Sequence, residues 1–151
     1  NWAGLCDISK KEMADFADLP IAISGSDINE KMITICKANW QRAYLPGLPV
    51  VRQVDAIAVK PASDQGGVMV FNPPYGERLE INMEDLYGDI GNTLKRHYYN
   101  STAWFITSNM EALKFVGLRP SRKIKLFNAK LESIFAKYEL YDGSKKAKKN
   151  L

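Results

Sequence analysis

The stretch GVMVFNPPYGERL, residues 67–79, decides the fold of this chain. Its first five residues form a short apolar run that ends at turn-forming residues, which is the pattern of a buried β-strand. Two consecutive prolines have no N–H to donate, so we expect the strand to end at Asn72, which Pro73 holds extended. The sequence therefore predicts a rigid cluster of hydrogen-bond acceptors beside an aromatic ring, Tyr75. Ligands bind at this end of the strands in open α/β sheets.

Strand and helix patterns alternate on both sides of this stretch. The helical patterns cover residues 1–19, 29–40, 83–99 and 109–116. The strand patterns cover residues 21–24, 50–54, 67–71, 102–107, 124–127 and 131–141, the last two joined by a tight connection. Strands that alternate with helices and close with a hairpin predict an α/β fold with a mostly parallel sheet and an antiparallel C-terminal hairpin.

The composition is that of an ordinary globular protein. The chain has 151 residues, 46% of them hydrophobic and 25% charged, enough for one domain or part of one. No apolar run approaches the roughly 20 residues that span a bilayer, and no signal peptide is visible. Cys6 and Cys36 belong to no metal-binding motif, so we predict no metal site, no disulfide framework and a reducing, cytoplasmic location.

Charge and chain ends bear on partners and on domain boundaries. The net charge of +4 is compatible with a polyanionic partner. Residues 144–151, SKKAKKNL, carry four lysines and are interpreted as a basic tail or linker, which leaves residues 1–143 for the domain. Because the chain begins at Asn1 rather than at Met, we expect it to be part of a longer protein.

The Asn-Pro-Pro-Tyr cluster suits methyl transfer to an amine that is conjugated to a ring. The lone pair of such a nitrogen is delocalised, and two acceptors that pull on its N–H groups can orient it. The Asn72 side-chain oxygen and the Pro73 carbonyl would accept these bonds, while Tyr75 would stack on an extruded base. Orientation would then supply most of the catalysis. A sharp turn without catalytic role is the alternative interpretation.

Several stretches carry a family resemblance. Residues 72–75 match the (N/D)PP(Y/F) motif of S-adenosylmethionine-dependent amino-methyltransferases, and FNPPYGERL resembles the bacterial 23S rRNA guanine-N2 methyltransferases of the RlmL type, which carry a THUMP domain. Three further stretches agree with this family in order and spacing: GSDIN at residues 25–29, ITSN at 106–109 and KLFNAKLESIFAKYEL at 125–140. The resemblance covers nearly the whole chain. NPPY alone is shared with adenine-N6 DNA enzymes and protein-glutamine methyltransferases.

The resemblance implies a cofactor site for S-adenosylmethionine. It assigns the ribose hydroxyls to Asp27, at the end of one strand, and the adenine amino group to Asp55, at the end of the next. Ile28, Ala56 and Asn72 are the further cofactor contacts that it implies. From the residues alone, a helix-capping Asp27 and a turn-forming Asp55 are about equally good interpretations.

The resemblance also implies a substrate side of the site. The catalytic residues would be Asn72, Pro73, Pro74 and Tyr75. Tyr75 would also contact the substrate together with Glu77 and Arg78, although an ordinary surface ion pair is as good an interpretation of the last two. Ribosomal RNA is the implied partner, and no membrane is involved.

One expected element is not in this sequence. The family cradles the cofactor in a glycine-rich loop of the D-P-x-C-G-S-G kind, and no such motif occurs here. In the family's sheet order 3-2-1-4-5-7-6 the loop follows the central strand, so the strands ending at Asp27 and Asn72 would lie about 9 to 10 Å apart, two strand spacings. We therefore expect an upstream segment, with the THUMP domain, to supply the loop, and the isolated chain to be inactive.

The resemblance thus implies that the chain is the distal part of a Rossmann-like S-adenosylmethionine-dependent methyltransferase fold. The implied activity is methyl transfer from S-adenosylmethionine to the exocyclic N2 of a guanine in 23S rRNA. Adenine-N6 methylation of DNA or RNA is the alternative enzyme activity. A non-catalytic RNA-binding fragment or pseudoenzyme is the alternative of another class, because the glycine loop is absent and because Ala129 and Ser133 stand where relatives prefer Gly and Cys. The oligomeric state and the target nucleotide are not predicted.

Overall fold

The structure, a computed structural model, describes residues 2–15, 23–43, 45, 50–61, 66–74 and 82–142. The chain divides into two compact units, Asn1–Val59 and Lys60–Leu151. Each unit is described here by itself. The predicted tail, residues 144–151, lies outside the described residues.

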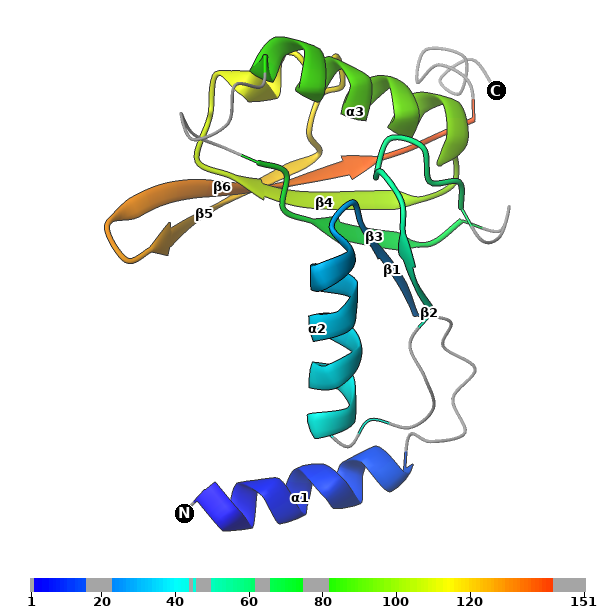
Figure 1. Cartoon of the computed structure of the whole chain (residues 1–151). Helices are drawn as coiled ribbons and strands as arrows, with labels where there is room; N and C mark the ends of the chain where they lie inside the picture. The colour runs from blue at the N-terminus through cyan, green and yellow to red at the C-terminus, as the bar shows by residue number, and fades with distance from the viewer. Residues whose placement is uncertain are drawn as a thin grey trace, which may run out of the picture. The chain divides into compact units, whose positions relative to one another are not determined.

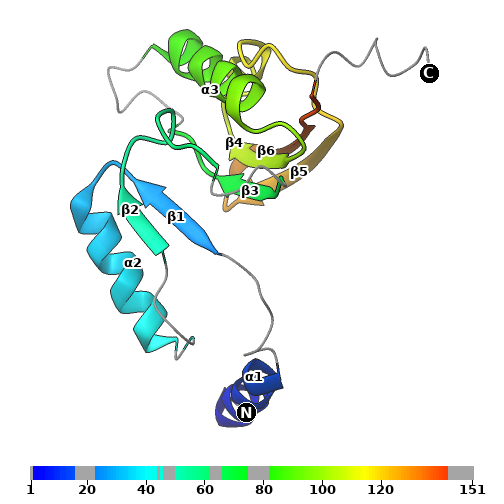
Figure 2. The ribbon, with the colours of Figure 1, turned by 90° about the vertical axis from the view of Figure 1, so that its right-hand side faces the viewer.

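The first unit contains two helices and a parallel strand pair. In chain order its elements are α1 (Trp2–Asp15), β1 (Ser24–Asp27), α2 (Glu30–Arg42) and β2 (Val50–Gln53). β1 pairs in parallel with β2, with Ser24 opposite Val50 and Asp27 opposite Gln53. α2 lies alongside the two strands (Figure 2). This crossover brings the carboxyl ends of both strands to the same edge.

The predicted position of the first strand is wrong. The structure places β1 at Ser24–Asp27, whereas the apolar pattern predicted a strand at residues 21–24 and a turn after it. Backbone pairing with β2 holds this segment extended, although its small polar side chains carry no strand signal. The predicted start of the next helix is confirmed: Asn29 caps α2 and accepts the Lys31 N–H at 2.9 Å.

The second unit is a four-stranded sheet covered on one face by a helix. Its elements are β3 (Val68–Phe71), α3 (Met83–His97), β4 (Thr102–Thr107), the 3-10 turn η1 (Ala112–Lys114), β5 (Arg122–Asn128) and β6 (Leu131–Glu139). The strand order is β3-β4-β6-β5. β3 and β4 are parallel, and β6 is antiparallel to both β4 and β5. α3 lies along one face of the sheet (Figure 1).

The predicted fold class is therefore confirmed. Parallel pairs are combined with an antiparallel C-terminal hairpin, and helices follow the strands as expected. Where a helix was expected at residues 109–116, the structure has only a 3-10 turn, Ala112–Lys114. Gly117 then takes a φ of +64° and ends this segment.

A stack of aromatic rings forms the core between α3 and the sheet. Phe105 of β4 stacks on Phe71 and on Tyr138, each with ring centroids 5.0 Å apart. Tyr87 of α3 meets Phe105 edge-on at 6.2 Å. Such pairs add about 0.5–1.5 kcal/mol each beyond their buried area. Because Phe71 directly precedes Asn72, this stack anchors the strand that carries the candidate site.

A glycine allows α3 to approach the segment after η1. A Cβ atom at Gly91 would lie 1.8 Å from the carbonyl oxygen of Val116, closer than any real contact. Both residues are buried. The close contact of helix and loop therefore requires glycine at position 91, although glycine lowers helix propensity by about 1 kcal/mol relative to alanine.

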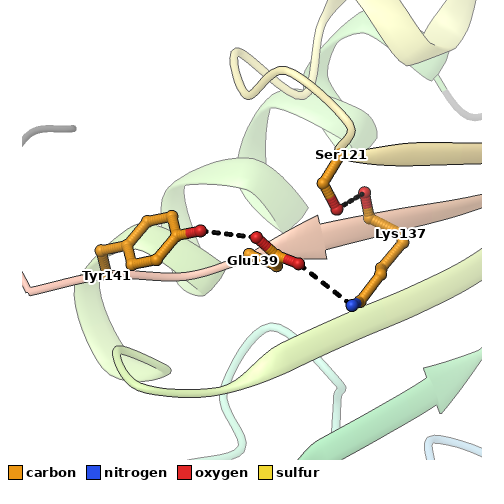
Figure 3. A network of polar contacts seen from close by, with 4 residues as sticks. All are labelled: Ser121, Lys137, Glu139 and Tyr141. Atoms are coloured by element: carbon orange, nitrogen blue, oxygen red, sulfur yellow. Dashed lines mark hydrogen bonds and ion pairs between the residues drawn. The ribbon is translucent and has the colours of Figure 1, made fainter.

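A polar network joins the start of β5 to the end of β6 (Figure 3). The Ser121 N–H and hydroxyl donate to the Lys137 carbonyl at 2.8 and 3.4 Å. The Lys137 ammonium donates to the Glu139 carboxylate at 3.0 Å, and the Tyr141 hydroxyl donates to the same carboxylate at 2.5 Å. This last bond raises the pKa of the Tyr141 phenol. The network holds the open end of the hairpin together.

Two absences hold for the part of the chain that the structure describes. None of its helices is long and apolar enough to cross a bilayer. It also contains no group of three or more His, Cys, Asp or Glu side chains that could hold a metal ion.

Candidate active site

Asp27 and Asp55 follow neighbouring parallel strands at the same edge of the first unit. Asp27 is the last residue of β1 and pairs with Gln53, and Asp55 lies two residues beyond Gln53. The Val54 N–H donates to the Asp27 carbonyl at 3.1 Å, so the strands remain bonded up to the point where the loops begin. Both carboxylates therefore lie on loops at the carboxyl ends of adjacent strands, the usual ligand position in α/β sheets.

One oxygen of each carboxylate accepts a hydrogen bond from the backbone of its own loop. Oδ1 of Asp27 accepts the Asn29 N–H at 2.7 Å, and Oδ1 of Asp55 accepts the Ile57 N–H at 2.9 Å. These two-residue turns fix the orientation of each carboxyl group. Both side chains are exposed, and neither second oxygen bonds to a described residue. Each can accept further hydrogen bonds from a ligand. Since Asn29 is the N-cap of α2, helix capping does not account for Asp27.

Ile28 and Ala56 lie beside these carboxylates in the same two loops. Both side chains are exposed, with 68% of Ile28 accessible. The Ile28 carbonyl accepts a hydrogen bond from the Gln53 side chain at 3.2 Å, which ties the loop after β1 to the end of β2. Sequence reasoning missed this role of Gln53, because a single glutamine near a strand end belongs to no motif.

Asn72, Pro73 and Pro74 follow β3 in the second unit. Pro73 is buried, whereas the side chains of Asn72 and Pro74 are exposed. The Asn72 side chain bonds to no described residue, so its oxygen remains available as an acceptor. The rigid Pro73 ring and the stacked Phe71 ring hold the Asn72 backbone from both sides. The sequence prediction of a strand that ends at Asn72 is confirmed, since β3 is Val68–Phe71.

A buried hydrogen-bonded chain supports the end of the neighbouring strand. Thr107 lies two residues beyond Phe105, and Pro73 lies two residues beyond Phe71, the ladder partner of Phe105. The Tyr87 and Thr107 hydroxyls are 2.6 Å apart, and Thr107 Oγ1 also accepts the Asn109 N–H at 3.0 Å. These contacts give the ITSN stretch a structural function. The resemblance marked the stretch, but residue types alone did not reveal Tyr87 as its partner.

Three predicted site residues fall outside the described residues. They are Tyr75, Glu77 and Arg78, in the segment that follows Pro74. Their roles in stacking on a base and in contacting substrate stay predictions. The candidate residues that the structure describes are thus Asp27, Ile28, Asp55 and Ala56 in the first unit, and Asn72, Pro73 and Pro74 in the second.

The fold is that of a class of proteins, the S-adenosylmethionine-dependent methyltransferases. The solved structure of SMU.472, in complex with SAH, is similar to this chain with a TM-score of 0.74 and 25% identity, covering 84% of this chain and 34% of that one. A Listeria monocytogenes protein named "a predicted N6-adenine-specific DNA methylase" is similar with a TM-score of 0.67 and 32% identity, covering 84% of this chain and 32% of that one.

The chain belongs to the RMKL-like methyltransferase domain family, which it matches over residues 3–137. It is 32% identical over 126 residues to ribosomal RNA large subunit methyltransferase K/L of Shewanella loihica, covering 82% of this chain and 18% of that protein. The protein of the same name from Legionella pneumophila is 34% identical over 116 residues, covering 76% and 16%. The chain thus spans less than a fifth of the length of these two relatives. The predicted family is confirmed.

Proposed function

We propose that this chain takes part in the transfer of a methyl group from S-adenosylmethionine to the exocyclic N2 of a guanine in large-subunit rRNA. The observation that carries the proposal is the exposed Asn72 side chain, which bonds to no described residue and stands next to the buried Pro73 at the end of β3. The names of the relatives support RNA of the large ribosomal subunit as the substrate. Bacteria, the source of these relatives, make and process such RNA in the cytoplasm, so we propose that location for the activity.

The chemistry requires orientation of the target nitrogen more than it requires a base. The lone pair of the guanine amino group is delocalised into the ring, and S-adenosylmethionine supplies a methyl group bound to a positively charged sulfur. Hydrogen bonds from the two N–H groups to the Asn72 side-chain oxygen and the Pro73 carbonyl would hold the nitrogen for attack. Tyr75 would stack on the extruded base. As the N–C bond forms, the C–S bond breaks, and the amine loses its proton to water.

The acidic loops of the first unit fit the nucleoside part of the cofactor. The second oxygen of Asp27 can accept from the ribose hydroxyls, and the second oxygen of Asp55 can accept from the adenine amino group. Ile28 offers an exposed apolar side chain for the adenine face, and Ala56 is small enough to leave space for it.

Further parts of the site would come from outside this sequence. The sequence contains no glycine-rich cofactor loop, and the relatives are several times longer than the chain. We propose that residues 1–143 form one methyltransferase domain together with a segment that supplies this loop, and that a THUMP domain of the same protein assists in binding rRNA. Glu77 and Arg78 would contact the RNA backbone near the target base.

Adenine-N6 methylation is the second candidate function. It uses the same Asn-Pro-Pro-Tyr chemistry on another exocyclic amine, and the 32% identical protein from Listeria monocytogenes carries an adenine-specific name. Over most of this chain, however, relatives at similar identity are named for large-subunit rRNA. These names favour large-subunit rRNA over DNA as the substrate, and the choice of guanine N2 as the target rests on the resemblance of the FNPPYGERL stretch.

Replacement of Asn72 tests the catalytic half of the proposal. In the protein at its natural full length, Asn72→Ala should lower kcat for methyl transfer to unmodified rRNA on the order of 10²-fold, because one orienting hydrogen bond is lost. Asn92→Ala removes an exposed asparagine from α3 and should leave the rate unchanged. Equal rates for the two variants would overturn the role of Asn72.

Replacement of Asp27 tests the cofactor half separately. Calorimetric titration of the full-length protein with S-adenosylmethionine should show about tenfold weaker binding for Asp27→Ala, since a charge-assisted bond to ribose contributes roughly 1.5 kcal/mol. Asp89→Ala, which removes an exposed carboxylate from α3, is the matched control. A normal dissociation constant for Asp27→Ala would remove this residue from the cofactor site.

A further inference from the structure

Apart from the C-terminal tail, the positive charge of the chain is concentrated in one stretch. Residues 112–131 contain six lysines and arginines and no aspartate or glutamate. The whole chain has a net charge of +4, so everything outside this stretch has a net charge of −2, the difference between +4 and +6. The stretch runs from η1 through β5 to the turn of the hairpin. Its charge is therefore a local feature of this part of the second unit.

A pocket of about 310 Å³ lies where this stretch leaves η1 and enters β5. Three cationic side chains line it, Lys114, Arg119 and Lys123, together with apolar ones that include Met110, Leu113 and Leu118. No carboxylate lines it. Lys114 is paired with Glu111, whereas Arg119 and Lys123 make no ion pair with any described residue. The pocket therefore combines two cations that have no ion-pair partner among the described residues with several apolar side chains.

The same face of the hairpin continues the pocket along β5. Lys123 is the ladder partner of Ala136, which belongs to the core beneath α3. Paired residues share a face of the sheet, so Lys123 and every second residue after it lie on the α3 side. These residues are Lys123, Lys125 and Phe127. Lys125 is paired with Glu132 at 2.8 Å, and Phe127 is 64% exposed. All three side chains are exposed, so the helix does not cover this row. Figure 1 shows the β5–β6 hairpin extending beyond α3.

We infer that the pocket and the adjoining row on β5 bind a single-stranded segment of the RNA substrate, with phosphates on Arg119 and Lys123. The inference rests on the proposed function for the choice of RNA. A small anion would be expected where several donors converge on one point. Here Arg119 stands before β5, Lys123 lies on it, and the row ends at the exposed ring of Phe127. This spread of charge with an aromatic ring suits an extended polyanion with planar bases. The second unit would thus hold RNA at a surface separate from Asn72.

Salt-dependent RNA binding tests the inference. The probe is a short, fluorescently labelled single-stranded RNA of mixed sequence, titrated with the full-length protein at several salt concentrations. The double variant Arg119→Gln with Lys123→Gln should bind about tenfold more weakly. The slope of log K against log salt should fall by about 1.4, because each phosphate contact on a single strand contributes about 0.7. Lys11→Gln with Lys37→Gln removes two exposed cations from α1 and α2 and should change neither value.

Two further measurements separate charge, geometry and chemistry. Arg119→Lys keeps the charge and should keep the slope of log K against log salt for RNA binding. Inorganic phosphate should displace the RNA no better than chloride does at equal ionic strength. Equal losses in the pocket and control variants, an unchanged slope in the pocket variant, or saturation of the pocket by inorganic phosphate alone would overturn the inference. If the protein binds RNA through these residues but transfers no methyl group, the proposed function fails and this inference stands.

Discussion

The hydroxyls of Tyr87 and Thr107 lie 2.6 Å apart in the buried interface between α3 and the end of β4. Thr107 also accepts the Asn109 N–H, and Asn109 in turn accepts the Ala112 N–H at 3.0 Å. One short chain of bonds thus fixes the helix, the strand end and the start of η1. The strand end in question is the neighbour of the Asn72-Pro73 turn. The bond between Tyr87 and Thr107 therefore helps to position the proposed catalytic turn.

Removal of this bond should lower stability measurably. Tyr87→Phe leaves the Thr107 hydroxyl with one partner fewer and should lower the free energy of unfolding by about 1–2 kcal/mol in urea titrations. Tyr99→Phe removes the hydroxyl of an exposed tyrosine and is the matched control. A loss no larger in Tyr87→Phe than in the control would show that the bond contributes nothing.

Two glycines of α3 should respond to alanine in opposite directions. Gly91→Ala places a Cβ 1.8 Å from the Val116 carbonyl oxygen, so we expect a loss of about 2–3 kcal/mol as helix and loop move apart. Gly88→Ala places a Cβ 3.9 Å from the Phe115 carbonyl oxygen, an ordinary contact, and should gain up to about 1 kcal/mol from helix propensity. Thermal unfolding of both variants checks the pair. Equal effects of the two would contradict the close approach at Gly91.

The hairpin turn contains an alanine where the backbone favours glycine. Asn128 pairs with Leu131, so Ala129 and Lys130 form a two-residue turn, and Ala129 has a φ of +54°. A positive φ at the first turn residue is typical of type II′ turns, which favour glycine there. Ala129→Gly should therefore stabilise the chain by roughly 1 kcal/mol. Ala58→Gly, in a turn without positive φ, should destabilise it slightly, and a loss in both variants would contradict this account.

This backbone angle also bears on the pseudoenzyme alternative. The family resemblance indicated glycine at position 129, and the structure shows that the preference concerns the turn conformation. The departure therefore concerns the geometry of the hairpin turn. It gives no support to a loss of catalysis.

Tyr138 has a buried hydroxyl without a hydrogen-bond partner among the described residues. Burial raises the pKa of Tyr138 to about 12, and the nearby Tyr87 adds to the effect. Tyr138→Phe removes this unsatisfied group, so we expect stability at neutral pH to stay equal or to rise by about 1 kcal/mol. Urea titration at pH 7 measures it. A loss of more than about 1 kcal/mol would show that the hydroxyl has a bound water or another partner.

The same tyrosine makes stability depend on alkaline pH. The folded-state pKa lies above the ordinary value of 10.0, so between pH 10 and 12 the unfolded chain loses the proton while the folded chain keeps it. Stability from this group is complete below pH 10 and is lost as the pH rises toward 12. Over this range the unfolding free energy of the natural chain should fall relative to that of Tyr138→Phe. A difference in unfolding free energy that stays constant between pH 10 and 12 would contradict the raised pKa of Tyr138.

The order of elements could be predicted from the sequence because each strong signal was local. The apolar run before Asn72, the spacing in α3 and the cap at Asn29 all depend on neighbouring residues, and the structure has each of them. β1 was misplaced because its residues, SGSD, form a strand only through pairing with β2. That pairing is a contact between distant parts of the chain, which local patterns do not encode.

In the candidate site, too, local sequence signals could be predicted and contacts between distant residues could not. Asp27, Asp55 and Asn72 were singled out because each stands at the carboxyl end of a predicted strand, and the resemblance implied their roles, which stay predictions. The support from Tyr87 and Gln53 could not be predicted, because these side chains act across the fold on residues 20 and 25 positions away. The pocket at Arg119 and Lys123 left one signal in the sequence, the stretch of residues 112–131 without a carboxylate.

Mass mapping of methylated nucleosides tests the central claim most directly. Large-subunit rRNA would be purified from the source organism and from the same cells without the gene, and each pool digested to nucleosides. The account expects one N2-methylguanosine to be missing without the gene, to return with the natural gene and to stay missing with Asn72→Ala. An unchanged N2-methylguanosine content, or the loss of N6-methyladenosine instead, would contradict it.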